Sequence, residues 1–375
     1  MILAGIDEAG LGPVLGPLVV SAASFRLSQG GAGGEVGGPN LWPILTGCVT
    51  RKKSQARRSG SIVVGDSKKL FNRKKADGLV PLERGVLTML LCAATRSAVA
   101  PGCEKNSPAT NTNTATKKPQ PQKPQPGATV LQKTTAGGGC ATLPRSLGEL
   151  LDAVAPGARR QANSYPWYDS CDLPLPSQAS ATDIELTANA LRVAMKPAGL
   201  SLLSMRAEPV FVSEFNKLIV ATNNKSTATL DITSRSLMRL CQAWPGEHIR
   251  ITVDRQGGRV RYRPQLQRLF PGCDLKIVEE CDLLSAYRII AGPRRIEIAF
   301  RVGAEDKSLP VALASMLSKY LRELCMECFN RFWAEHVADI KPTAGYYVDG
   351  RRFYSEITQA MEKLGIDPSS VYRTR

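Results

Sequence analysis

The stretch MILAGIDEAGLGPVLGPLVV, residues 1–20, decides how the fold begins. Its apolar residues 2–6 predict a buried strand that ends in two adjacent carboxylates, Asp7 and Glu8. A segment rich in glycine and proline follows, and a second strand is expected at about 17–26. An Asp-Glu pair before a glycine turn is also typical of a plain solvated turn. The rest of the chain has to decide between a surface turn and half of an active site.

Composition limits the class of protein. The chain has 375 residues, of which 43% are hydrophobic and 22% are charged, so it can form a substantial core. Its formal net charge is +16, which favours a polyanionic partner, with nucleic acid as the leading candidate. A basic surface that serves only solubility is the alternative.

The cysteines and histidines do not predict a zinc site. Ten Cys are spread without the spacing of a disulfide framework, and one CxxC (Cys325, Cys328) lies in a helical pattern. His248 and His336 lie outside zinc-finger spacing. We therefore expect reduced thiols and a cytoplasmic protein. No signal peptide and no membrane span are expected, and we expect a monomer.

The hydrophobic patterns indicate an α/β protein, because strands come early and then mix with helices. A Pro-, Gln-, Thr- and Lys-rich stretch at about 101–140 predicts disorder, since it cannot bury enough apolar surface. An irregular segment is expected at 28–60, and a hairpin arm at 260–264. Further strands are expected at 209–214, 249–254, 275–280 and 294–302, and helices at 72–98, 146–154, 182–195, 214–243 and 310–339.

Two more carboxylates share the position of Asp7 and Glu8 at an element end. Asp254 ends the alternating strand IRITVD, and Asp306 precedes the long helix that begins near residue 310. If these strands form one sheet, their ends converge at one edge. Such a cluster needs a cation, and oxygen-only ligands favour Mg²⁺ or Mn²⁺. Separate solvated turns are the alternative.

Six segments, in order, resemble those of the type 2 ribonuclease H family. The first resembles the family's GIDEAGRGP signature, and the second resembles its DSKKL segment. The ordered set is far more specific than any one of its members. The segments are GIDEAGLGPVLGPLVVSA (5–22), GDSKKLFNRKK (65–75), EFNKLIVATNNKSTATL (214–230), ITVDRQG (251–257), EDKSLPVALASMLSKYLRE (305–323) and TAGYYVDGRRF (343–353).

The resemblance implies a ribonuclease H-like fold, with a central mixed sheet flanked by helices. It also implies a two-metal endoribonuclease that cuts the RNA strand of RNA–DNA hybrids, or ribonucleotides embedded in duplex DNA. The metal-binding and catalytic carboxylates would be Asp7, Glu8, Asp254 and Asp306. The substrate-binding residues would be Gly10, Leu11, Gly12, Ser67, Lys68, Lys69, Lys319 and Tyr346.

The resemblance also divides the chain. It implies a catalytic core at 1–98 and 206–358, an insertion at 99–205 that is of low complexity at about 101–140, and a C-terminal extension at 359–375. The insertion either modulates substrate access or is a disordered loop with some helices.

Leu11 departs from the family pattern, because it stands where the family has the arginine of Gly-Arg-Gly. Backbone contacts to a ribose survive this change, whereas a guanidinium contact to phosphate does not. Two alternatives to an active, ribose-specific nuclease therefore stay open. One is a weak or inactive nucleic-acid-binding homologue, and the other is a nuclease with relaxed ribose selectivity.

Overall fold

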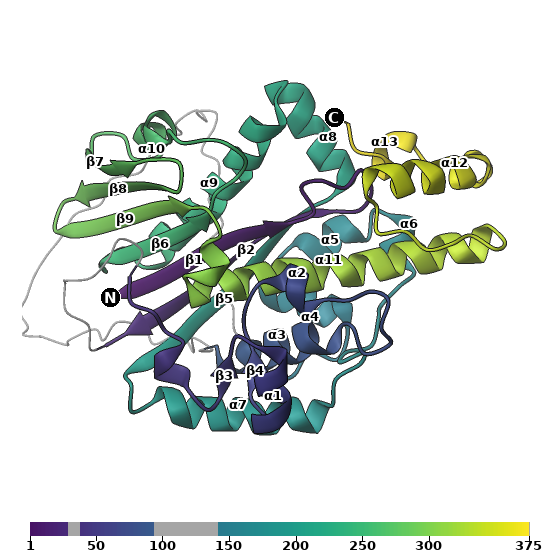
Figure 1. Ribbon diagram of the computed structural model, residues 1–375. Coiled ribbons are helices and arrows are strands. Elements are labelled where there is room, and N and C mark those ends of the chain that lie inside the picture. Colours follow the sequence, from purple (N-terminus) through teal and green to yellow (C-terminus); the bar gives the residue numbers. More distant parts are fainter. Residues whose placement is uncertain (29–37, 94–141, 375) are drawn as a thin grey trace, which may run out of the picture.

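Strand β1 (Ile2–Ala9) is an interior strand of a seven-stranded mixed sheet of order β5-β2-β1-β6-β9-β8-β7 (Figure 1). The structure is a computed structural model, and it describes residues 1–28, 38–93 and 142–374. Strand β1 is parallel to β6, which is parallel to β9, and the other neighbours are antiparallel. The other strands are β2 (Leu18–Leu27), β5 (Leu200–Val210), β6 (Ile249–Asp254), β7 (Asp274–Glu280), β8 (Leu284–Ala291) and β9 (Arg294–Arg301).

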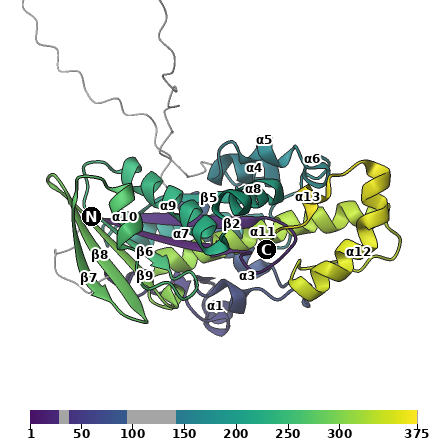
Figure 2. The same cartoon turned by 90° about the horizontal axis from the view of Figure 1, so that it is seen from above.

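Helices cover both faces of this sheet, as the two views in Figures 1 and 2 show. Successive side chains of β1 point to opposite faces of the sheet. Ile2, Ala4 and Ile6 therefore join one core, and Leu3 joins the other. Helices α8 (Val212–Thr222), α9 (Lys225–Ala243) and α10 (Arg263–Leu269) pack on the first core, and α3 (Val80–Cys92), α7 (Ala181–Met195) and α11 (Leu309–His336) pack on the second. The expected α/β fold with a central mixed sheet is confirmed.

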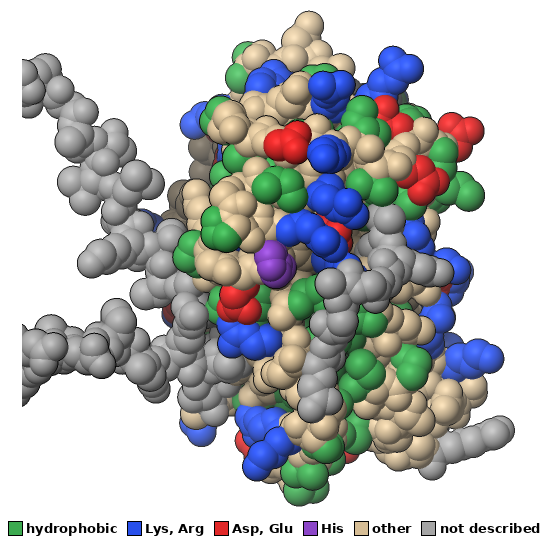
Figure 3. All heavy atoms as spheres, turned by 90° about the vertical axis from the view of Figure 1, so that its left-hand side faces the viewer, with side chains coloured by type: hydrophobic (Ala, Val, Ile, Leu, Met, Phe, Trp, Pro, Cys, Tyr) green, Lys and Arg blue, Asp and Glu red, His purple; other side chains and the backbone are tan. Residues whose placement is uncertain are grey.

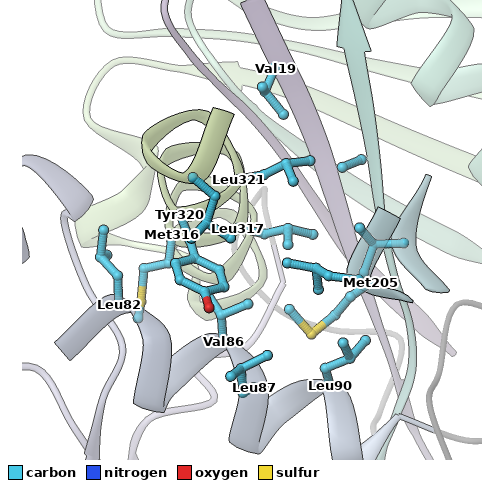
Figure 4. Close-up of a cluster of buried hydrophobic side chains, with 14 of the residues drawn as sticks. Val19, Leu82, Val86, Leu87, Leu90, Met205, Met316, Leu317, Tyr320 and Leu321 are labelled. Carbon is cyan, nitrogen blue, oxygen red and sulfur yellow. The ribbon is translucent and has the colours of Figure 1, made fainter. Parts of the chain in front are cut away.

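Helix α11 lies directly against the sheet and also packs against α3. Leu317 and Leu321 point toward the strands, whereas Met316 and Tyr320 point toward α3 (Figure 4). The approach depends on Gly5 of β1, because a Cβ there would lie 2.2 Å from the Val311 backbone nitrogen. Glycine at this position therefore lets the first turn of α11 rest on the strand that ends in Asp7 and Glu8.

Residues 142–198 form helices that join the α11 core. Trp167 is buried, and its ring centroid lies 5.4 Å from that of Phe329 and 6.2 Å from that of Trp333, both on α11. This segment comprises α4 (Leu147–Val154), α5 (Ala158–Ala162), α6 (Pro166–Asp169) and α7.

A buried carboxylate on α3 holds the same segment in place. Glu83 accepts the backbone N–H groups of Ser177, Gln178 and Ala179, each at 2.7 Å. It also accepts the Tyr320 hydroxyl of α11 at 2.9 Å. Because a buried charge needs this many donors to be stable, Glu83 ties the segment to α3 and α11 at once.

The remaining elements are short or lie at the chain's end. They are η1 (Pro43–Leu45), β3 (Val49–Thr50), α1 (Lys53–Ser59), β4 (Ile62–Val63), α2 (Ser67–Leu70), η2 (Ala304–Asp306), α12 (Tyr347–Leu364) and α13 (Pro368–Val371). Strands β3 and β4 form a small parallel sheet of their own. The prediction of an irregular segment at 28–60 is therefore wrong where η1, β3 and α1 form.

Three further expectations of secondary structure need correction. The strand expected at 209–214 is β5, which ends at Val210, and Val212 already begins α8. The expected hairpin arm at 260–264 is absent, since the structure has no strand between β6 and α10; Tyr262 instead stacks on Phe300 with ring centroids 3.6 Å apart. The helix expected at 72–98 begins only at Val80, because a proline at position 81 fits the first turn of a helix and not its interior.

Most of the other elements are confirmed. The strand expected at 249–254 is β6 with the same limits, and the helix expected at 310–339 is α11. The helices expected at 146–154, 182–195 and 214–243 correspond to α4, α7 and the pair α8 and α9. The predicted disordered stretch at 101–140 lies outside the described residues.

The cysteines of the described residues are all free, eight in number. None of the described helices combines the length and the apolar character that crossing a bilayer requires.

Candidate active site

The ends of β1 and β6 bring two carboxylates side by side. Ile6 pairs with Val253 at the end of the parallel register, so Asp7 and Asp254 follow at the same edge of the sheet. Asp7 is buried, and its carboxylate Oδ1 accepts the Glu8 backbone N–H at 2.7 Å. The ends of β1 and β6 thus lie at one edge of the sheet, where strand ends of an open α/β sheet meet.

Asp7 sits in a strongly perturbed environment. Burial raises the pKa of Asp7 well above its usual value, and the charges of Glu8 and Asp254 raise it further. A hydrogen bond from Ser315 of α11 opposes this rise in pKa. Helix α11 also holds the strand end through the Ser318 hydroxyl, which donates to the Asp7 carbonyl at 3.1 Å.

Glu8 is held by a side chain that follows β6. Gln256 donates its amide N–H to Glu8 Oε2 at 3.1 Å and to the Thr233 hydroxyl of α9 at 2.7 Å. Burial raises the pKa of Glu8, while Gln256 and the charge of Lys68 lower it. Gln256 thus fixes the carboxylate between β1 and α9, a role that the sequence analysis did not foresee.

Asp254 faces a carboxylate that the sequence analysis did not select, Glu305. The Ala304 backbone N–H donates to Asp254 Oδ1 at 2.9 Å, at the start of η2. Burial raises the pKa of Asp254 to about 7, and the neighbouring carboxylates Glu305 and Glu8 add to the rise. Glu305 Oε2 is buried, and no described residue forms a hydrogen bond with it. Glu305 therefore lies close to Asp254 and Glu8.

Asp306, the predicted fourth carboxylate, points to basic residues instead. Arg51 donates to its backbone carbonyl at 2.8 Å and to its Oδ1 at 3.2 Å. Lys69 Nζ lies 4.0 Å from its other oxygen, and the Asp306 side chain is 52% exposed. Successive side chains of a 3₁₀ turn point in different directions, so Glu305 and Asp306 cannot both face the same neighbours.

The four clustered carboxylates fit a hard divalent cation by their chemistry. They offer only oxygen ligands, burial opposes their ionisation, and Glu305 Oε2 lacks a partner. Over residues 1–28, 38–93 and 142–374, no three or more His, Cys, Asp or Glu side chains form a group that could hold a metal ion. The fit is thus one of donor type and charge.

The glycine loop after β1 lies beside Tyr346. Gly10 has φ +93°, a conformation that favours glycine, and the Cβ position of Gly12 lies 4.0 Å from Tyr346 Cε1. The loop is fixed to this neighbour because the Val14 N–H donates to the Gly345 carbonyl at 2.7 Å. Tyr346 is 53% exposed, so the loop and an accessible aromatic ring form one surface.

Leu11 keeps its side chain partly buried. It packs against the core between the sheet and helices α8 and α9. The apolar residue therefore anchors the loop to the protein, whereas a charged residue at this position would reach toward solvent.

The predicted Ser67 and lysine contacts lie in different settings. Ser67 is buried and shares a hydrogen bond of 3.0 Å with Ser315, so it supports the serine that contacts Asp7. Lys68 and Lys69 are exposed on α2, and Lys69 Nζ lies 3.1 Å from Asp66. Lys319 donates to Glu323 at 2.7 Å, above the Phe71 ring.

Basic side chains also occur far from the carboxylates. Figure 3 shows them gathered along the middle of the face on which β7, β8, β9 and the N-terminus lie, with fewer acidic side chains among them. This face is at the start of β1, whereas Asp7 and Glu8 lie near its end. The net positive charge of the chain is thus spread over more than one surface.

Comparisons with known proteins find likeness only among solved structures. No family model matches the chain, and no curated protein matches it. A structure of the complex of PCNA with ribonuclease HII from Archaeoglobus fulgidus matches with a TM-score of 0.37 and 14% identity, over 100% of this chain and 95% of the other. Ribonuclease H2 from Pyrococcus horikoshii matches with a TM-score of 0.34 and 12% identity, over 99% and 92%. "Bst-RNase HIII" in complex with Mn²⁺ matches with a TM-score of 0.38 and 12% identity, over 100% and 66%. Identity and TM-score are low in all three matches, so the function proposed below depends on this chain's own residues.

Proposed function

We propose that this protein is a divalent-metal-dependent endoribonuclease that hydrolyses phosphodiester bonds of RNA in RNA–DNA hybrids or of ribonucleotides in duplex DNA. The observation that supports it best is the group of four carboxylates (Asp7, Glu8, Asp254, Glu305) near the strand ends. Asp7 and Glu8 come directly before the glycine loop in the sequence. A protein that only bound nucleic acid would gain nothing from such negative charge beside phosphates.

The carboxylates would hold Mg²⁺ or Mn²⁺. When bound, such ions supply an activated water and stabilise charge at the leaving oxygen. The protein's part is to orient its ligands: Gln256 fixes Glu8, and Ser315, itself supported by Ser67, fixes Asp7. Asp306 would keep Arg51 and Lys69 near the site.

Recognition of ribose would come from the glycine loop and Tyr346. Without a Cβ at Gly12, the backbone can approach a 2′-hydroxyl, which is the group that distinguishes RNA from DNA. The exposed Tyr346 ring beside it offers a flat surface for the sugar. Lys68 and Lys69, exposed on α2, would attract the phosphate backbone. Lys319 would act mainly through Glu323, which it already contacts.

The test is a cleavage assay on three matched duplexes with Mg²⁺ or Mn²⁺: an RNA–DNA hybrid, a DNA duplex with one ribonucleotide, and plain DNA. We expect cleavage of the first two and none of the third. Binding without cleavage would support the inactive homologue, and cleavage of plain DNA would support relaxed ribose selectivity.

A matched control distinguishes the loss of a carboxylate in the site from the loss of a carboxylate elsewhere on the protein. Asp7→Asn should abolish cleavage, because it removes a carboxylate from the centre of the cluster. Asp274→Asn, on the exposed edge strand β7, should leave cleavage unchanged. Persistent activity of Asp7→Asn would remove Asp7 from the site.

A further inference from the structure

The residues that follow α13, 372–374, pack against the glycine loop. Tyr372 forms a β-bridge with Leu15, and the Arg373 N–H donates to the Val14 carbonyl at 2.9 Å. The Arg373 side chain then enters the protein beneath the loop and is only 2% exposed. Residues some 360 positions apart in sequence are therefore in direct contact.

The Arg373 guanidinium binds three carbonyls of the loop. Its Nε donates to Gly16 O at 2.8 Å, and its Nη1 donates to Gly10 O at 2.5 Å and to Pro13 O at 3.4 Å. Arg373 Cζ lies over the Phe215 ring, 4.9 Å from its centre. Within the described part of the chain, no carboxylate forms an ion pair with Arg373, so loop carbonyls are its main hydrogen-bond partners.

Burying this charge is costly, and burial lowers the pKa of Arg373 to about 9, with the nearby Arg322 as a second cause. Core packing alone would be served better by an apolar side chain. The geometry supplies another role. A trans peptide points its N–H opposite to its C=O, so holding the Gly10 carbonyl inward turns the Leu11 N–H outward.

The closing segment is itself anchored to α8. Asn216 donates to the carbonyls of Ser369 and Tyr372, both at 2.9 Å, and accepts the Thr374 N–H at 2.7 Å. Helix α8 thus anchors the residues on both sides of Arg373. The loop's shape consequently depends on contacts that no neighbouring residue in the sequence provides.

We propose that Arg373 is a positioning residue that fixes the glycine loop in the shape in which it meets the ribose and phosphate groups of nucleic acid. The inference rests on the proposed function and deepens it, because it names what keeps the recognition loop rigid. Leu11 secures the loop by packing, and Arg373 secures it by hydrogen bonds from within.

The experiment compares Arg373→Lys and Arg373→Gly in the full chain with wild type. Lysine keeps the charge but has one nitrogen in place of the planar fork of Nε and Nη1 that reaches three separate carbonyls. It also keeps the test informative if the glycine variant does not fold. Hydrogen exchange of the peptide that covers residues 10–17, measured without substrate, should become about ten-fold faster in both variants. Millimolar guanidinium, far below denaturing concentrations, should restore protection to Arg373→Gly.

Kinetics give the second readout. On a duplex with one ribonucleotide, KM should rise about ten-fold while kcat changes little, since the carboxylates are untouched. The control is Arg331→Lys, an exposed arginine paired with Glu327, which should change neither quantity. Wild-type exchange in both Arg373 variants, or faster exchange with an unchanged KM, would overturn the proposal. If wild type cleaves no ribonucleotide substrate, the proposed function fails, and the exchange measurement still decides whether Arg373 holds the loop.

Discussion

Asp254→Asn should stabilise the free protein while it abolishes catalysis. The carboxylate is crowded by Glu305 and Glu8 and is largely removed from water, so the folded protein resists its ionisation. Asparagine has nearly the same shape, and its Oδ1 can still accept the Ala304 N–H. The substitution therefore removes a repulsive charge and little else.

The magnitude follows from the pKa of Asp254, which burial and its acidic neighbours raise from 3.8 to about 7. At pH 8, ionisation of this group costs the folded state about 4 kcal/mol relative to the unfolded chain. Because neighbouring carboxylates titrate together with it, we expect Asp254→Asn to raise the free energy of unfolding by about 2–4 kcal/mol. A raised pKa stabilises the fold at low pH, and this contribution is lost as the pH rises through 7. At pH 4 the gain should therefore fall below about 1 kcal/mol.

The assay is urea unfolding at pH 8 and pH 4 with a chelator present. Asp274→Asn is the control and should change stability by less than about 0.5 kcal/mol. Added Mg²⁺ or Mn²⁺ at pH 8 should stabilise wild type, by about 2.7 kcal/mol at a hundred times its Kd, and should stabilise Asp254→Asn much less. A variant no more stable than wild type at pH 8, or an equal gain at both pH values, would refute the reasoning.

Three other substitutions test separate parts of the structure. Glu305→Gln should reduce cleavage of a ribonucleotide-containing duplex by about 100-fold, and Asp306→Asn by far less; the reverse order would restore Asp306 as the fourth ligand. Leu11→Arg should tighten binding to that duplex about ten-fold by adding a charged phosphate contact, and equal affinity in a titration would exclude this effect. Glu83→Gln should lower the free energy of unfolding by about 2 kcal/mol or more, because two backbone N–H groups lose their acceptor; unchanged urea unfolding would contradict it.

The sequence predicted best what periodicity encodes. Strand β6 alternates over its length, helix α11 is a long segment that begins at a proline, and the strand ends place Asp7 and Asp254 at one edge of the sheet. Strand β8 was not predicted, and the start of α3 was misplaced: the mostly polar residues 72–78 precede the helix, which begins at Val80 with a proline in its first turn. Short elements such as α1 lack enough residues for a pattern to emerge.

The site was harder to predict where the direction of a side chain matters more than its position in the sequence. Glu305 and Asp306 are adjacent in sequence, and only the path of η2 decides which carboxylate joins Asp254. Ser67 has the right place in the sequence for a substrate contact, yet it is buried against Ser315. Arg373 could not be found from any local motif, because its partners lie at the opposite end of the chain.

The packing of residues 142–198 has a consequence for anyone who wishes to shorten this protein. Deleting them would expose the α11 aromatic side chains now covered by Trp167, and would leave the buried charge of Glu83 without its three backbone donors. Both effects oppose folding of the remainder. The catalytic core expected at 1–98 and 206–358 therefore depends on these helices for its folding, and a shortened version of the protein must retain them.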